Sequence, residues 1–159
     1  MTRGPAAAGF TLVELVIVLV VAGVLAAVGT SRFFGVRDFQ ARGFYDETRA
    51  AVRYAQKRAV ASGCDVEVNV GPGGFALRER SGCASGAFTR AVRKPGSGGA
   101  FAASPPPRVP VGRMDFYYDP LGRPRDVASG AVLTASPSVT IGGHTPRTLT
   151  VEHETGFVH

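Results

Sequence analysis

Residues 9–14 read GFTLVE, and this stretch opens an apolar run that continues to residue 28. Between Phe10 and Gly29, about 20 residues carry one ionisable side chain, that of Glu14. A helix rises about 1.5 Å per residue, so this length matches the roughly 30 Å hydrocarbon core of a bilayer. The run therefore predicts a membrane-spanning helix, preceded by a short leader whose single cationic side chain is Arg3.

Three interpretations of this segment are open. It is an ordinary signal peptide cleaved near Ala26 and Ala27, a plain membrane anchor, or an apolar helix whose leader is removed ahead of it. The first is disfavoured because Glu14 would place a carboxylate at the start of the apolar core of the signal peptide.

Glu14 is the residue that decides among them. A carboxylate near the centre of a spanning helix costs roughly 2.5–3.5 kcal/mol, so it marks a functional site by default. Cleavage after Gly9 would create a cation to meet it, the new α-amine of Phe10. If that amine met Glu14 of a neighbouring subunit, the head-to-tail contact would not close into a ring and would propagate as a helical filament.

These six residues and their apolar tail resemble the signal sequence of type IV pilins and type II secretion pseudopilins. The resemblance implies cleavage by a prepilin peptidase between Gly9 and Phe10, N-methylation of Phe10, and a role for Glu14 in assembly. It also implies a single pass through the bacterial inner membrane with a periplasmic head, and later a place in a pilus at the cell surface. The partners would be the peptidase, the inner membrane and other pilin subunits. The weakly basic leader departs from the family pattern.

A helical pattern continues beyond the apolar run. Apolar or small residues recur at three- and four-residue steps, and charged residues fall elsewhere, which predicts an amphipathic helix with one buried stripe. The stripe consists of Phe44, Thr48, Ala51, Val52, Ala55 and Ala59. Gly63 is placed to end the helix. The expected organisation is a leader (1–9), a transmembrane and filament-core helix (10–30), an amphipathic helix (31–63) and a β-rich head (64–159).

The remainder of the chain predicts short strands separated by turns. Strands are expected at 65–70, 75–80, 113–118, 132–134, 138–141 and 148–153, with a turn at 71–74 and a long loop at 81–112. The fold class is therefore α+β, a long N-terminal helix packed on an antiparallel sheet of five or six strands. Residues 42–48, 51–64 and 155–158 also resemble the MshC-type minor pilins of the mannose-sensitive haemagglutinin (MSHA) pilus, which are related to the GspH/FimT group.

The chain has two cysteines, Cys64 and Cys83. They do not form a C-x-x-C motif, and two cysteines in an exported chain most simply pair with each other. A closed loop of about 20 residues would stabilise the fold by roughly 3 kcal/mol in the chain-entropy model. Two buried free thiols are the alternative.

No catalytic motif is present, and no cofactor or metal is expected. The histidines, His144, His153 and His159, lie late in the chain without acidic or cysteine partners at metal-ligand spacing, so solvated surface positions are predicted.

Nucleic-acid binding is a second possibility because the formal net charge is +6. Arg123 and Arg125 stand in a Gly-Arg-Pro-Arg sequence and could contact phosphates, as in DNA-binding FimT-like pilins. That family carries its basic motif at the chain end, where this chain has no arginine. The expected function is therefore a non-enzymatic MSHA-like minor pilin for adhesion, motility or surface attachment. The alternatives are a GspH-like pseudopilin and a FimT-like pilin for DNA uptake.

Overall fold

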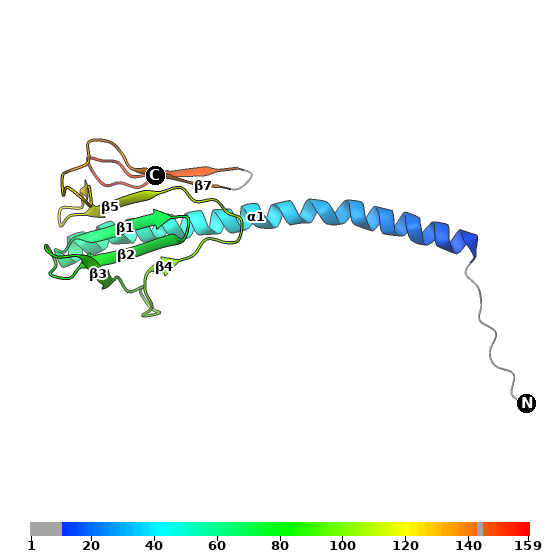
Figure 1. Cartoon of the computed structure of the whole chain (residues 1–159), viewed down its shortest axis with the longest axis horizontal. Coiled ribbons are helices and arrows are strands. Elements are labelled where there is room, and N and C mark those ends of the chain that lie inside the picture. The colour runs from blue at the N-terminus through cyan, green and yellow to red at the C-terminus, as the bar shows by residue number, and fades with distance from the viewer. Residues whose placement is uncertain (1–10, 143–144) are drawn as a thin grey trace, which may run out of the picture. The chain divides into compact units, whose positions relative to one another are not determined.

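The computed structural model describes residues 11–142 and 145–159, without the side chains of residues 27–35. It begins with one helix, α1 (Leu12–Ser62), and continues as strands (Figure 1). The strands are β1 (Val66–Gly71), β2 (Gly74–Arg80), β3 (Phe88–Ala91), β4 (Ala102–Ala103), β5 (Met114–Tyr118), β6 (Pro124–Arg125), β7 (Ser138–Ile141) and β8 (Arg147–Thr150). The chain divides into two compact units, Met1–Val36 and Arg37–His159. The apolar start of α1 belongs to the first unit, and the rest of α1 with all these strands forms the second.

Within the second unit, the predicted stripe of α1 is the face that packs on the sheet. All six of its residues are buried, and Ala51, Ala55 and Ala59 are at most 1% exposed. These methyl side chains let the sheet approach the helix closely. Thr48 satisfies its buried hydroxyl by donating to the carbonyl of Phe44 at 2.7 Å. The amphipathic helix was predicted correctly.

The helix ends where the sequence indicated. Gly63 has a positive φ of 68°, which a residue with a Cβ adopts only under strain. Its N–H donates to the carbonyl of Ala59 at 2.9 Å and so satisfies one of the last carbonyls of α1.

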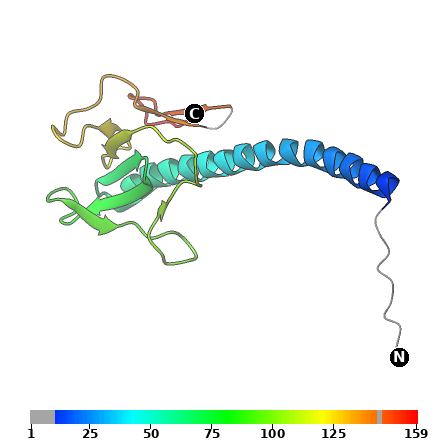
Figure 2. The same cartoon turned by 45° about the vertical axis from the view of Figure 1, so that its right-hand side comes forward.

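The main sheet is antiparallel, with strand order β3-β2-β1-β5-β6 and β4 paired to β2. In the central register, Val68 lies opposite Leu77 on one side and Phe116 on the other. Alternation along each strand places these apolar residues on one face, and Figures 1 and 2 both show β1, β2 and β5 running along α1. The α+β class and the helix-on-sheet arrangement are confirmed.

A separate pair, β7 and β8, adds a second layer of apolar side chains to the same core. Val139 and Ile141 of β7 and Leu149 of β8 are at most 2% exposed. Val151 follows β8 and forms an isolated bridge with Val158 near the end of the chain. The expected strand at 148–153 is therefore shorter and begins one residue earlier.

Two strand predictions were wrong. The segment 81–112 was expected to be a loop, yet it contains β3 and β4, both of which pair with β2. β3 is largely exposed, so it lacks the apolar alternation that marks a half-buried strand in a sequence. The expected strand at 132–134 is absent from the described residues. Val132 forms only an isolated bridge to Arg125, and it is Arg125 that belongs to a strand, β6.

The two cysteines are joined by a disulfide bond, as predicted. Cys64 follows the end of α1 and Cys83 follows β2, with their Cα atoms 4.4 Å apart. The N–H of Asp65 also donates to the carbonyl of Cys83 at 3.0 Å. The bond therefore ties the end of the helix to the end of the second strand.

Candidate functional site

The predicted processing and assembly residues lie at the start of α1. Gly9 and Phe10 are outside the described residues. Thr11 is the N-cap of the helix, because its hydroxyl oxygen accepts from the N–H of Glu14 at 3.2 Å. Glu14 occupies the third helical position, where a negative charge also interacts favourably with the helix dipole. The described helix begins at Leu12, with its acidic residue in the first turn.

The apolar side chains that follow are exposed all around this part of α1. Their exposed fractions lie between 49% for Val16 and 80% for Leu12. Seven successive large aliphatic residues, 15–21, are included, and successive helical residues point about 100° apart. They therefore cover every face of the helix, and no face of this stretch is buried by other described parts of the chain.

The exposed aliphatic surface is energetically unfavourable in water. Burying one large aliphatic side chain contributes about 1.5–3 kcal/mol, so seven of them contribute on the order of 10 kcal/mol or more. Residues 11–26 therefore need an apolar environment from outside the described part of the chain. In the described part of the chain, no helix combines enough length with enough apolar residues to be assigned as a membrane span.

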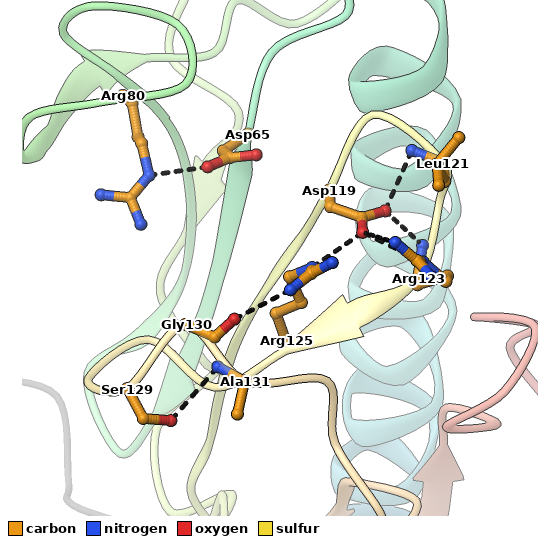
Figure 3. A network of polar contacts seen from close by, with 9 residues as sticks. All are labelled: Asp65, Arg80, Asp119, Leu121, Arg123, Arg125, Ser129, Gly130 and Ala131. Atoms are coloured by element: carbon orange, nitrogen blue, oxygen red, sulfur yellow. Dashed lines mark hydrogen bonds and ion pairs between the residues drawn. The ribbon is translucent and has the colours of Figure 1, made fainter.

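The two arginines predicted as a DNA contact converge on one carboxylate, Asp119 (Figure 3). Its Oδ2 accepts from Arg125 Nε at 2.8 Å and from Arg123 Nη2 at 3.0 Å. Its Oδ1 accepts from the backbone N–H groups of Leu121 and Arg123, at 2.9 and 3.0 Å. Arg125 also donates to the carbonyl of Gly130 at 3.0 Å. The network fixes the turn between β5 and β6.

Asp119 is buried, with 4% of its surface exposed. Burial alone would raise the pKa of this carboxyl, but the hydrogen bonds from Arg125 and Arg123 outweigh that effect, and its pKa is lowered. Arg123 and Arg125 thus have a structural role in closing the turn. Their binding to DNA stays a prediction.

The histidines are not brought together as a metal site in the described residues. His144 lies outside those residues. His153 Nδ1 is 3.3 Å from the Ser136 hydroxyl and 3.2 Å from a Glu152 oxygen. The ring of His159 stacks on that of Phe157, with centroids 6.2 Å apart.

The end of the chain is held by side chains that no sequence signal singled out. Gln56 of α1 donates to the carbonyls of Thr155 and Gly122 at 2.8 and 3.1 Å. The Tyr118 hydroxyl donates to the carbonyl of Gly156 at 3.0 Å. Thr155 and Gly156 are residue types common in turns, but a turn signal does not say which residues pack against it. In the sequence, Gln56 resembles any surface residue of a helix and Tyr118 any residue of a strand. Their roles depend on contacts with residues that are distant in the sequence.

Comparison with known proteins found similarities to the start of the chain and to its fold. The family described as "Prokaryotic N-terminal methylation motif" matches residues 5–30, which include Gly9, Phe10 and Glu14. The head has the fold of a solved type IV minor pilin, FimU of Pseudomonas aeruginosa strain PAO1. That structure aligns with a TM-score of 0.53 and 13% identity over 74% of this chain and 90% of FimU. The chain matches a prokaryotic N-terminal methylation motif and has the fold of a type IV minor pilin.

A second crystal form of FimU aligns in the same way, with a TM-score of 0.51 and 10% identity over 77% of the chain and 88% of FimU. At these identities the likeness establishes the fold alone. Among curated proteins, the chain is similar to PilA5 of Thermus thermophilus, named as the major component of a type IV narrow pilus. They are 47% identical over 49 residues, which is 31% of this chain and 42% of PilA5. The match therefore spans less than half of the relative.

Proposed function

We propose that this pilin-like chain is a minor subunit of a type IV pilus. The precursor enters the bacterial inner membrane as a single-pass protein with its head in the periplasm. Prepilin peptidase cuts between Gly9 and Phe10, and Phe10 is N-methylated. The apolar part of α1 then leaves the membrane and packs among the helices of other pilin subunits at the cell surface. The observation that supports this most strongly is the exposure of aliphatic side chains on every face of residues 12–25.

Glu14 gives the packing its register in this proposal. It is the only ionisable residue within that aliphatic stretch, and its carboxylate costs free energy unless a cation meets it. The α-amine that cleavage creates on Phe10 of a neighbouring subunit is such a cation. The methylated amine retains its positive charge, so modification does not remove the attraction.

The finer assignment, to an MSHA-like pilus for adhesion, motility or surface attachment, depends on the resemblance of residues 42–48, 51–64 and 155–158. A pseudopilin of a type II secretion system would use the same processing and the same helix. Deletion of the gene separates the two: loss of surface attachment with normal protein secretion supports the pilus, and the opposite result supports the secretion system.

Mass spectrometry of the N-terminal peptide from membranes tests the processing. The mature protein should begin at Phe10 and carry one additional methyl group. A Gly9→Ala variant should accumulate with the leader attached. Retention of the first nine residues in the native protein, or a cut beyond Ala26, would refute the proposal.

Two substitutions at Glu14 separate its charge from its local role in the helix. Gln can replace Glu at the third position of a capping box, but it cannot neutralise an amine. Glu14→Gln and Glu14→Ala should therefore both be cleaved normally and both be missing from sheared filaments. Asp46→Asn, at an exposed position of the same helix, is the control and should assemble normally. Normal assembly of the Gln variant would show that assembly does not need the charge of Glu14.

A further inference from the structure

A basic cleft of about 780 Å³ opens beside the end of α1. Its lining includes four cationic side chains, those of Arg58, Arg90, Arg93 and Lys94, and one carboxylate, that of Glu79. The cations come from the helix, from β3 and from the segment that follows β3. This excess of positive charge suits a ligand that carries several negative charges.

Glu79 holds two of the arginines in place without using up their donors. It is 4% exposed; its Oε1 accepts from Arg58 Nε at 2.6 Å, and its Oε2 forms an ion pair with Arg90 Nη2 at 3.4 Å. The side chains of Arg58 and Arg90 are nevertheless 43% and 56% exposed. A guanidinium has five N–H donors, so each of these groups keeps donors that face solvent. The buried acid thus orients two arginines toward the cleft.

The wall opposite the helix is an ordered turn. Lys94 N–H donates to the carbonyl of Gly99 at 2.7 Å, and Phe101 N–H donates to the carbonyl of Val92, also at 2.7 Å. The ring of Phe101 packs on that of Tyr54, with centroids 5.1 Å apart. Lys94 additionally pairs with Glu47 of α1 at 3.0 Å. Arg93 is exposed, and it donates to the carbonyl of Gly98 at 3.3 Å.

β3 forms one side of this cleft and is also the last strand of its sheet. Its neighbour is β2, and in the described residues no strand pairs with its other edge. Residues 89–91 are exposed. The free edge of a strand offers backbone N–H and carbonyl groups to an added strand, which is a recurring way of binding extended peptides.

We propose that β3 and the basic cleft bind an extended acidic segment of a partner protein. The segment adds a strand along the free edge of β3, and its carboxylates on the cleft side pair with Arg58, Arg90 and Arg93. Hydrogen bonds to the backbone of β3 align the bound segment with the strand, and the cations favour segments that carry acidic side chains. The site lies entirely in the second unit and does not depend on cleavage or on assembly, so it can fail while the proposed function holds.

The probe is a capped peptide of sequence TEVEVET, whose three glutamates fall on one face of a strand. Fluorescence anisotropy would measure its binding to the full chain in detergent micelles at low salt. Two matched peptides are the controls: TQVQVQT lacks the charges, and an analogue of TEVEVET with N-methyl groups on its third and fourth residues keeps the charges but lacks one backbone donor on each edge of the strand. Each change should weaken binding by about tenfold or more.

Arg93→Gln should weaken binding of TEVEVET by about tenfold, because one of the cleft cations is lost. Arg113→Gln, at an exposed position outside this cleft, should leave binding unchanged. Equal binding of the N-methylated peptide would overturn the proposal, since the edge of β3 would then not be used. The proposal would also be overturned if the peptide did not bind. This includes the outcome in which pyrophosphate binds, depends on Arg93 for its binding, and the peptide does not bind.

Discussion

Arg53 of α1 donates from Nη2 to the carbonyl oxygen of Val158 at 3.0 Å, which joins the helix to the next-to-last residue of the chain. Gln56 lies about one turn further along and binds the carbonyls of Thr155 and Gly122. Val158 itself is buried at 1% exposure and pairs with Val151. The last residues are therefore an integral part of the head, and α1 supplies polar contacts to them as well as an apolar face.

Gly156 is the position in this contact that tolerates a side chain least. Its φ is +70°, and a Cβ there would approach the carbonyl oxygen of Gly122, Gln56 Nε2 at 2.6 Å and Tyr118 Cε1 at 2.8 Å. Gly156→Ala should lower the free energy of unfolding by about 2 kcal/mol or more, from backbone strain and crowding together. Gly73→Ala is the control, since nothing lies within 4 Å of its Cβ position and its φ is not positive. Urea denaturation of both variants would measure the difference, and equal stability would contradict this description of the chain end.

Gln56 should matter through its amide group. In Gln56→Met, the carbonyls of Thr155 and Gly122 lose their donor while the volume of the side chain is nearly kept. We expect a loss of about 1–2 kcal/mol and faster hydrogen exchange of backbone amides in residues 150–159. Gln40→Met, at an exposed position of the same helix, should change neither measurement. Unchanged exchange at the chain end in Gln56→Met would show that the amide contributes nothing to holding it.

The disulfide should contribute substantially to stability. Replacing both Cys64 and Cys83 with Ser removes a cross-link across a sequence separation of 19 residues. The chain-entropy relation gives a cost of about 3 kcal/mol for a loop of this size. A reducing agent should lower the melting temperature of the native protein and have no effect on the double variant. Equal melting of reduced and oxidised native protein would contradict the prediction.

Asp119 predicts a specific dependence of stability on pH. Its pKa is lowered in the folded state, so it stabilises the fold above the ordinary aspartate pKa of about 3.9, and this contribution is lost as the pH falls through the lowered value. Asp119→Asn should cost about 1.5–3 kcal/mol at pH 7, because charge-assisted hydrogen bonds are lost. The difference between native protein and variant should shrink as the pH is lowered toward 3. Glu154→Gln, at an exposed position, serves as the control, and a difference that does not change with pH would refute the role given to Asp119.

The helix and the central strands could be predicted because their signals are local. The stripe from Phe44 to Ala59 repeats with the period of a helix, and Val66, Val68 and Val70 alternate as a strand does. Gly63 follows the stripe, and glycine is the residue that most readily adopts the positive φ found at the end of many helices. Each signal is contained within a few residues and is independent of what packs against it.

Features that depend on contacts between distant residues were missed or were assigned another role. β3 exists because it pairs with β2, and its exposed residues carry no apolar alternation. Arg123 and Arg125 suggested a phosphate contact, yet their nearest anion in the folded head is Asp119. More than 30 residues separate Arg58 from the other three cleft cations in the sequence, and only the packing of α1 beside β3 brings Arg58 near Arg90.

The disulfide also has a mechanical consequence. Cys64 and Cys83 close a covalent ring that contains the whole of β1 and β2. If the head is stretched between its two ends, tension passes across the sulfur atoms, and the hairpin inside the ring cannot be unzipped. About 19 residues are thereby withheld from extension, which removes roughly 60 Å from the length to which a pulled subunit can unravel.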